Sequence, residues 1–156
     1  MLENRAFDHM LGFMAETATD IDGCLPSNPA CVNPVDPLDP SSPTVAVDDT
    51  AVYQQTDPSH SISGTTSQIY ATSNTTEDMK GFIASYTSRT GDADKGPSIM
   101  KCFSTEHVPA MSSLASEFAV FDGYFASVPG PTQVNRAYAA SATSNGMGTN
   151  DKETCK

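Results

Sequence analysis

The amino-acid sequence predicts an α/β fold, and its last third carries the observations that predict it. Residues 118–121 (FAVF) form a short, continuous apolar run, which is typical of a buried parallel strand. A helix with Pro109 in its first turn precedes this run, and a further helix begins near Thr132 after a rigid Pro-Gly-Pro loop. A helix, a buried strand, a loop and a helix in this order indicate layered α/β packing.

Amphipathic helices are expected over residues 5–16 and 77–87. In both segments apolar residues recur at a helical spacing that places them on one face. A short strand is expected at 51–53, and residues 67–70 are expected to lie at one end of a short helix. Residues 88–97 contain the Gly, Asp and Pro residues of a turn region.

Residues 24–50 are expected to form an extended surface loop or insertion. Prolines at positions 26, 29, 34, 37, 40 and 43 recur too often for a regular helix or strand. The 156 residues amount to about one domain. Because the chain opens inside what reads as a structured motif, residues 1–156 are expected to be an incomplete domain, a fragment of a longer protein.

The charge balance disfavours two classes of partner. The formal net charge is −11, from 19 Asp and Glu against 8 Lys and Arg. Nucleic acids and anionic membrane surfaces are poor partners for such a chain, because both are bound through Lys and Arg. A divalent cation fits the balance better, although acidity also serves solubility. No run reaches the ~18 apolar residues of a membrane span, so no transmembrane segment is expected.

The cysteines and one sequon favour a secreted or cell-surface protein. The four cysteines match no zinc-binding spacing, but Cys24 and Cys31 flank a short proline-containing loop in which a local disulfide is expected. Residues 74–76 (NTT) form a sequon for N-linked glycosylation. No signal peptide is visible, and in a fragment its absence carries little weight.

The junction between loop and helix at Thr132 is the first candidate for chemistry. Thr132 follows Pro131 and precedes a helical run, so its hydroxyl suits a helix N-cap. The same position suits catalysis, because helix N-termini bind phosphate and the loops after strands bind ligands in α/β proteins. A threonine hydroxyl needs activation to act as a nucleophile, and a divalent metal ion supplies it.

Glu3 and Asn4 are the second candidate. They precede the first expected helix and offer a carboxylate and an amide oxygen, donors that suit Mg, Ca or Mn. Alternatively, Asn4 caps the helix and Glu3 is solvated. The residue types alone leave both interpretations open.

Several segments, in the same order along the chain, resemble motifs of the phosphoesterase family that contains bacterial and plant non-specific phospholipases C and acid phosphatases. The segment 125–136 is the most specific of them. The matching segments are 1–12 (MLENRAFDHMLG), 57–60 (DPSH), 68–70 (QIY), 79–82 (MKGF), 108–122 (VPAMSSLASEFAVFD), 125–136 (FASVPGPTQVNR) and 141–146 (SATSNG).

The resemblance implies an α/β/α sandwich of the alkaline phosphatase superfamily, here truncated at both ends. It implies that Thr132 takes the nucleophile position, contacts the metal ion and forms a covalent phosphoenzyme. It also implies that Glu3 and Asn4 are metal ligands. The family's remaining Asp and His ligands come from a C-terminal segment that these residues do not include, and two or three oxygens make no closed site for a hard cation.

Three further residues receive roles from the resemblance. His60 is expected to contact the phosphate or the leaving group, with a purely structural role as the alternative. Asn135 and Arg136 are expected to bind substrate and to organise the loop and helix behind Thr132, with helix-start hydrogen bonding as the alternative. Asp8 and His9, in the first helix, are expected to be structural.

The function that follows is hydrolysis of phosphate esters. Cleavage of a phospholipid head group is expected, with transient membrane-surface contact by the full-length parent. One alternative is an acid phosphatase that acts on phosphomonoesters, and another is a truncated chain without catalysis. The identity of the divalent metal ion (Ca, Mg or Mn) is left open.

Overall fold

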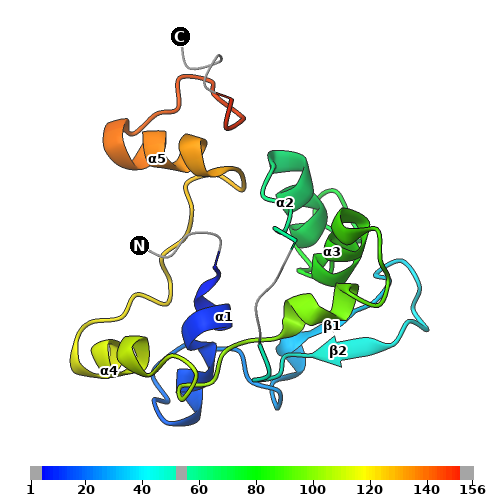
Figure 1. Ribbon diagram of the computed structural model, residues 1–156. Coiled ribbons are helices and arrows are strands. Elements are labelled where there is room, and N and C mark those ends of the chain that lie inside the picture. Colours follow the sequence, from blue (N-terminus) through cyan, green and yellow to red (C-terminus); the bar gives the residue numbers. More distant parts are fainter. Residues whose placement is uncertain (1–4, 52–55, 152–156) are drawn as a thin grey trace.

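The computed structural model describes residues 5–51 and 56–151. Five α-helices, three short 3₁₀ helices and one two-stranded sheet lie in these ranges, and Figure 1 shows their arrangement. In chain order they are α1 (Phe7–Leu11), η1 (Gly12–Glu16), η2 (Pro29–Cys31), β1 (Val32–Pro34), β2 (Thr44–Ala46), α2 (Ile62–Ile69), α3 (Phe82–Thr90), η3 (Gly96–Met100), α4 (Pro109–Glu117) and α5 (Thr132–Ser141).

The sheet lies inside the proline-rich segment, where no strand was expected. β1 and β2 pair antiparallel, with Val32 opposite Ala46 and Pro34 opposite Thr44. The prolines do not prevent this pairing, because Pro34 ends β1 and the next three lie in or beside the connecting turn. A proline at a strand end removes no hydrogen bond from the middle of the ladder. The expectation of a loop without strands over 24–50 is therefore wrong at residues 32–34 and 44–46.

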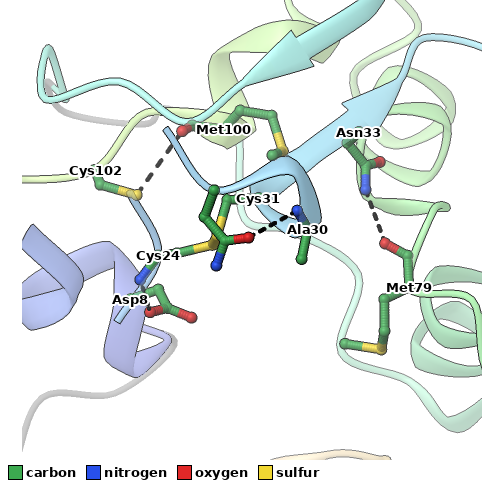
Figure 2. Close-up of a disulfide and its surroundings, with 9 residues drawn as sticks. Asp8, Cys24, Ala30, Cys31, Asn33, Met79, Met100 and Cys102 are labelled. Carbon is green, nitrogen blue, oxygen red and sulfur yellow. Dashed lines mark hydrogen bonds between the residues drawn. A yellow bond between two sulfur atoms is a disulfide. The ribbon is translucent and has the colours of Figure 1, made fainter. Parts of the chain in front are cut away.

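The small core joins this segment to the rest of the chain. Phe13, Cys31, Val47 and Cys102 form a buried apolar cluster. The disulfide expected between Cys24 and Cys31 is confirmed, with an S–S distance of 2.05 Å. It closes the loop that leads into β1 and places one half-cystine in the core (Figure 2).

Asn33 of β1 fixes the start of α3. Its side chain is only 2% exposed. The Asn33 amide donates to the Met79 carbonyl over 2.8 Å, as Figure 2 shows, and its oxygen accepts from the N–H groups of Phe82 and Ile83 at 3.1 and 3.3 Å. These two N–H groups belong to the first turn of α3, where helices need partners from outside.

The expected helix over 77–87 therefore starts later. Met79 has a positive φ of 54° and is 50% exposed, so it lies outside the helix. Gly81 is the N-cap of α3, and a Cβ there would lie 2.0 Å from the Ser67 carbonyl oxygen, which only glycine avoids. The rest of the apolar face behaves as expected, because Ile83 and Tyr86 are buried.

The expected buried strand at 118–121 is wrong for the part of the chain described. Phe118 is extended, but the run is not part of a sheet, and Phe118 and Phe121 are 71% and 76% exposed. An apolar run becomes a buried strand only beside other strands, and none of the described residues supplies one next to it. The fold is a mixture of helices and a small sheet, which agrees with the α/β class at a coarse level only.

The other expected elements are mostly confirmed. The helix expected over 5–16 is α1 followed by the 3₁₀ helix η1, and residues 67–70 end α2. Pro109 occupies the first turn of α4. Of the strand expected at 51–53, only Ala51 is described, and it is not in a strand. In the described ranges, no helix has both the length and the apolarity needed to cross a bilayer.

Candidate active site

Thr132 is the first residue of α5, but it is not the helix cap. Pro131 holds the N-cap position in an extended conformation, with φ −76° and ψ 166°, and the N-cap residue itself makes no side-chain capping hydrogen bond. The capping interpretation of Thr132 is therefore wrong, because the rigid proline before it already ends the extended segment. In the first turn, the N–H of Gln133 donates to the side-chain oxygen of Asn150 over 2.8 Å.

Asn135 holds the loop before Thr132 in shape. Its side-chain oxygen accepts from the N–H of Val128 at 3.1 Å. Its amide nitrogen lies 3.1 Å from the carbonyl oxygens of Val128 and Gly130 and 3.3 Å from that of Pro131. One side chain thus binds both ends of the loop that presents Thr132, as expected for a residue that organises this loop.

The loop before α5 also packs against the start of α2. A Cβ at Gly130 would lie 2.9 Å from the Ile62 side chain, and one at Gly148 would lie 3.5 Å from it. The close approach at Gly130 explains why this loop carries a residue without a side chain. Because His60 lies two residues before Ile62, this contact brings the segment that ends in His60 next to the N-terminus of α5.

His60 is oriented by two oxygens. Its Nδ1 lies 3.2 Å from a carboxylate oxygen of Asp57 and 3.2 Å from the Pro58 carbonyl oxygen. Both neighbours are acceptors, so Nδ1 is placed to donate a hydrogen bond to them when it carries the proton. The Asp57 carbonyl oxygen also accepts from Nε of Arg89 at 3.2 Å, which ties the segment to α3.

One hollow of ≈ 270 Å³ brings these parts together. It is lined by residues 58–61, Arg89, Pro131 and residues 148–150. His60 and Arg89 therefore face the same space as the residue immediately before Thr132. A guanidinium group beside a helix N-terminus favours an anion such as a phosphate.

His60 also lines a second hollow of ≈ 260 Å³, which reaches the N-terminal segment. Arg5, Ala6 and His9 form one wall of this hollow, and α3 forms another. The structure thus places His60 between the residues that directly follow the expected metal ligands and the loop that carries the expected nucleophile.

Asp8 and His9 have structural environments, as expected. Asp8 accepts from the N–H of Cys24 over 2.9 Å, and burial raises the pKa of its carboxyl group. The His9 ring packs edge-on against Phe103 with centroids 5.1 Å apart. Burial, followed by the charge of Arg5, lowers the pKa of His9. Both residues hold α1 against the core.

Arg136 does not lie where a shared site with His60 would need it. It is exposed, and it lines a different hollow together with Gln133 and residues 141–147. The structure therefore separates Arg136 from the hollow that contains His60 and Arg89, while Asn135 stays behind the Thr132 loop. The role expected for Asn135 and Arg136 together stays a prediction for Arg136.

The expected metal ligands Glu3 and Asn4 lie outside the described residues. Over residues 5–51 and 56–151 there is no group of three or more His, Cys, Asp and Glu residues that could hold a metal ion. The described part of the chain therefore does not form a closed metal site by itself. Of the expected donor set, only Thr132 lies within the described residues.

Arg89 is the site residue that the sequence did not indicate. It lies in the last turn of α3, within a segment expected to be a turn. One feature could have drawn attention to it: the chain has only 8 Lys and Arg, so a cation near the candidate phosphate site is uncommon. Its place beside His60 depends on the packing of α2 against α3, which Figure 1 shows.

Sequence comparisons find relatives of this chain among the plant phospholipases. Non-specific phospholipase C1 of Arabidopsis thaliana is 39% identical over 155 residues, which cover 98% of this chain and 28% of that protein. Non-specific phospholipases C6 and C3 of the same plant are 36% and 37% identical and are covered over 27% and 30% of their lengths. The chain thus spans less than a third of the relatives it matches. The sequence profile described as "Phosphoesterase family" matches residues 1–156, so this chain belongs to the phosphoesterase family.

Proposed function

We propose that the protein is a hydrolase of phosphate esters and that it cleaves the head-group phosphate ester of phospholipids, as a phospholipase C does. The relatives named non-specific phospholipase C support the reaction class. The observation that carries the proposal is the hollow in which His60 and Arg89 face the loop that ends at Thr132.

The described residues suggest how the reaction proceeds. Arg89 and the N-terminal end of α5 attract the phosphate anion. The Thr132 hydroxyl oxygen attacks phosphorus, so that an Oγ–P bond forms and the P–O bond to the diacylglycerol oxygen breaks. His60 contacts the phosphate or the departing oxygen, which leaves as an alcohol after it takes up a proton. Water then attacks the phosphorus of this Thr132 phosphodiester, so that the Oγ–P bond breaks, the Thr132 hydroxyl is restored and the phosphorylated head group leaves.

A divalent cation belongs to the same proposal. The carboxylate of Glu3, the amide oxygen of Asn4 and the hydroxyl of Thr132 are hard oxygen donors of the type that Mg, Ca and Mn prefer. A cation bound there would favour the ionised form of the attacking hydroxyl. The described residues leave its remaining donors unassigned.

An α/β/α sandwich of the alkaline-phosphatase-like type is the fold that we propose for the complete domain. The apolar run at 118–121 supports it, because four consecutive apolar residues are typical of an inner strand of a parallel sheet. An experimental structure of the gene product that leaves Phe118 and Phe121 in solvent would contradict this part of the proposal.

The test is hydrolysis by the protein as encoded by its gene. Diacylglycerol release from phosphatidylcholine vesicles and phosphate release from a small phosphomonoester are measured in parallel, with and without a chelator. Thr132→Ala is expected to lower the rate on the preferred substrate about a thousandfold or more, because it removes the nucleophile. Thr143→Ala, two residues beyond the C-terminal end of α5, is the matched control and is expected to keep the wild-type rate.

Two outcomes separate the parts of the proposal. Faster turnover of the phosphomonoester than of the vesicles would replace the lipid substrate with a small phosphate ester. Wild-type activity in Thr132→Ala would remove the nucleophile assignment and with it the proposed mechanism.

A further inference from the structure

The loop between α2 and α3 carries an acceptor sequence that the proposed function does not use. Asn74 is followed by Thr75 and Thr76, the Asn-X-Thr pattern that oligosaccharyl transfer requires. We propose that Asn74 is N-glycosylated and that the protein therefore passes through the oxidising secretory compartment.

The base of this loop is tied to the end of α2. The backbone N–H groups of Asp78 and Met79 both donate to the Ile69 carbonyl oxygen, at 2.9 and 3.0 Å. The Asp78 carboxylate accepts from the backbone N–H groups of Ala71 and Thr72, at 3.1 and 2.8 Å. The loop therefore leaves the helix and returns to it within a few residues, with its tip turned outward.

The tip presents the acceptor side chain to solvent. Asn74, Thr75 and Thr76 are all exposed. The Ser73 hydroxyl accepts from the N–H groups of Thr75 and Thr76, at 3.2 and 3.3 Å, so the turn is built from the backbone and from Ser73. Within the described ranges, no hydrogen bond engages the Asn74 amide. An exposed asparagine on an irregular loop is the form in which this modification is accommodated.

The disulfide is an independent observation that points to the same compartment. Cys24 and Cys31 are joined, and Cys31 is buried in the core (Figure 2). Structural disulfides persist in oxidising compartments and are rare in reducing ones. A protein that forms this bond during secretion meets the glycosylation machinery in the same place.

The chemistry needs one co-substrate, an oligosaccharide carried on a polyprenyl diphosphate. The Asn74 side-chain nitrogen attacks the anomeric carbon of the first sugar. A C–N bond forms, the C–O bond to the diphosphate breaks, and the amide nitrogen loses one proton. No oxidant or reductant is involved.

The glycan would not block the candidate active site. The first turn of α2 packs against Gly130 in the loop before α5, whereas Asn74 follows the other end of that helix. α2 has eight residues, which span about 12 Å at the usual rise per residue. The sugar therefore extends from the end of α2 that points away from His60 and Thr132.

The test is peptide mass analysis of the protein as encoded by its gene, produced in a eukaryotic cell. Enzymatic removal of N-glycans is expected to shift the mass of the protein and to leave Asp in place of Asn74. Asn74→Gln and Thr76→Ala are expected to abolish the shift. Thr75→Ala, which removes a neighbouring threonine but keeps the sequon, is expected to retain it, as is Thr76→Ser.

A secreted protein with the Cys24–Cys31 bond formed but an unmodified Asn74 peptide would overturn the proposal. A protein that stays in the cytosol with both cysteines reduced would overturn it as well. Loss of hydrolysis in Asn74→Gln would contradict the placement of the glycan away from the site, whereas failure of Thr132→Ala to affect activity bears only on the proposed function.

Discussion

Asn33 offers a sharp test of how the proline-rich segment holds the site. It is buried in β1, donates to the Met79 carbonyl and accepts from the N–H groups of Phe82 and Ile83. These partners are 46 to 50 residues away in sequence. Phe82 and Ile83 begin α3, the helix that places Arg89 beside His60. Asn33→Ala removes all three hydrogen bonds and leaves their partners with nothing to replace them.

The expected cost follows from the number and burial of these bonds. Each contributes about 1 kcal/mol net, so their loss costs about 3 kcal/mol. Polar groups left buried without partners raise the cost toward about 5 kcal/mol, because Asn33 is only 2% exposed and water has little access. That is a large part of the roughly 5–15 kcal/mol by which a domain is stable.

Urea unfolding of the gene product measures this cost. If the dependence of the unfolding free energy on urea concentration is unchanged, a lower midpoint concentration of urea gives the stability that the variant has lost. Asn28→Ala is the matched control, because Asn28 is exposed and accepts one hydrogen bond, from the N–H of Ala30 at 2.9 Å. It is expected to cost about 1 kcal/mol or less. If the two variants lost the same stability, the link from β1 to α3 would not have the strength derived from the contacts.

Three further variants test other parts of the structure. Asn135→Ala removes the side-chain hydrogen bonds that hold the loop before Thr132. It is expected to cost about 2 kcal/mol in urea unfolding and to lower the rate of hydrolysis at least about tenfold. An unchanged rate would refute the role of Asn135 in holding this loop. The pKa of Asp78 is lowered to about 2, chiefly by the Thr72 hydroxyl bond, so its carboxylate stabilises the fold above the unfolded pKa and loses this effect as pH falls toward about 2. Asp78→Asn should therefore flatten the acid side of the thermal stability profile, and an unchanged profile would count against the assignment. Burial raises the pKa of the Cys102 thiol to about 11. Alkylation of this thiol near pH 8 is therefore expected to be slow in the native protein and fast in urea. Rapid alkylation of Cys102 in the native protein would contradict its buried position.

Local patterns in the sequence predicted several elements because those elements depend on local spacing. The apolar spacing predicted α1 and most of α3, and Pro109 predicted the start of α4. The β1–β2 hairpin was missed because the proline count hid the fact that the prolines lie at strand ends and in the turn. The run at 118–121 predicted a buried strand, but burial depends on neighbouring strands that the described residues do not contain.

The site was predicted only where it depends on residues that are close in sequence. The loop-to-helix junction at Thr132 and the clamp by Asn135 are local, so the motif indicated both. The meeting of His60 and Arg89 requires α2, α3 and the loop before α5 to pack together, which no sequence spacing records. The resemblance gave Arg136 and Asn135 one role, whereas successive residues of a helix point in different directions and Arg136 lines a different hollow.

Acid quenching during turnover decides whether Thr132 is the nucleophile. The gene product is mixed with excess phosphatidylcholine vesicles, stopped within a few turnovers, digested and analysed by mass spectrometry. The phosphorylated head group, here phosphocholine, is expected on the peptide that contains Thr132, and it should be absent from the Thr132→Ala protein. Steady hydrolysis with no phosphocholine on the Thr132 peptide, or with phosphocholine on another residue, would contradict the proposed reaction.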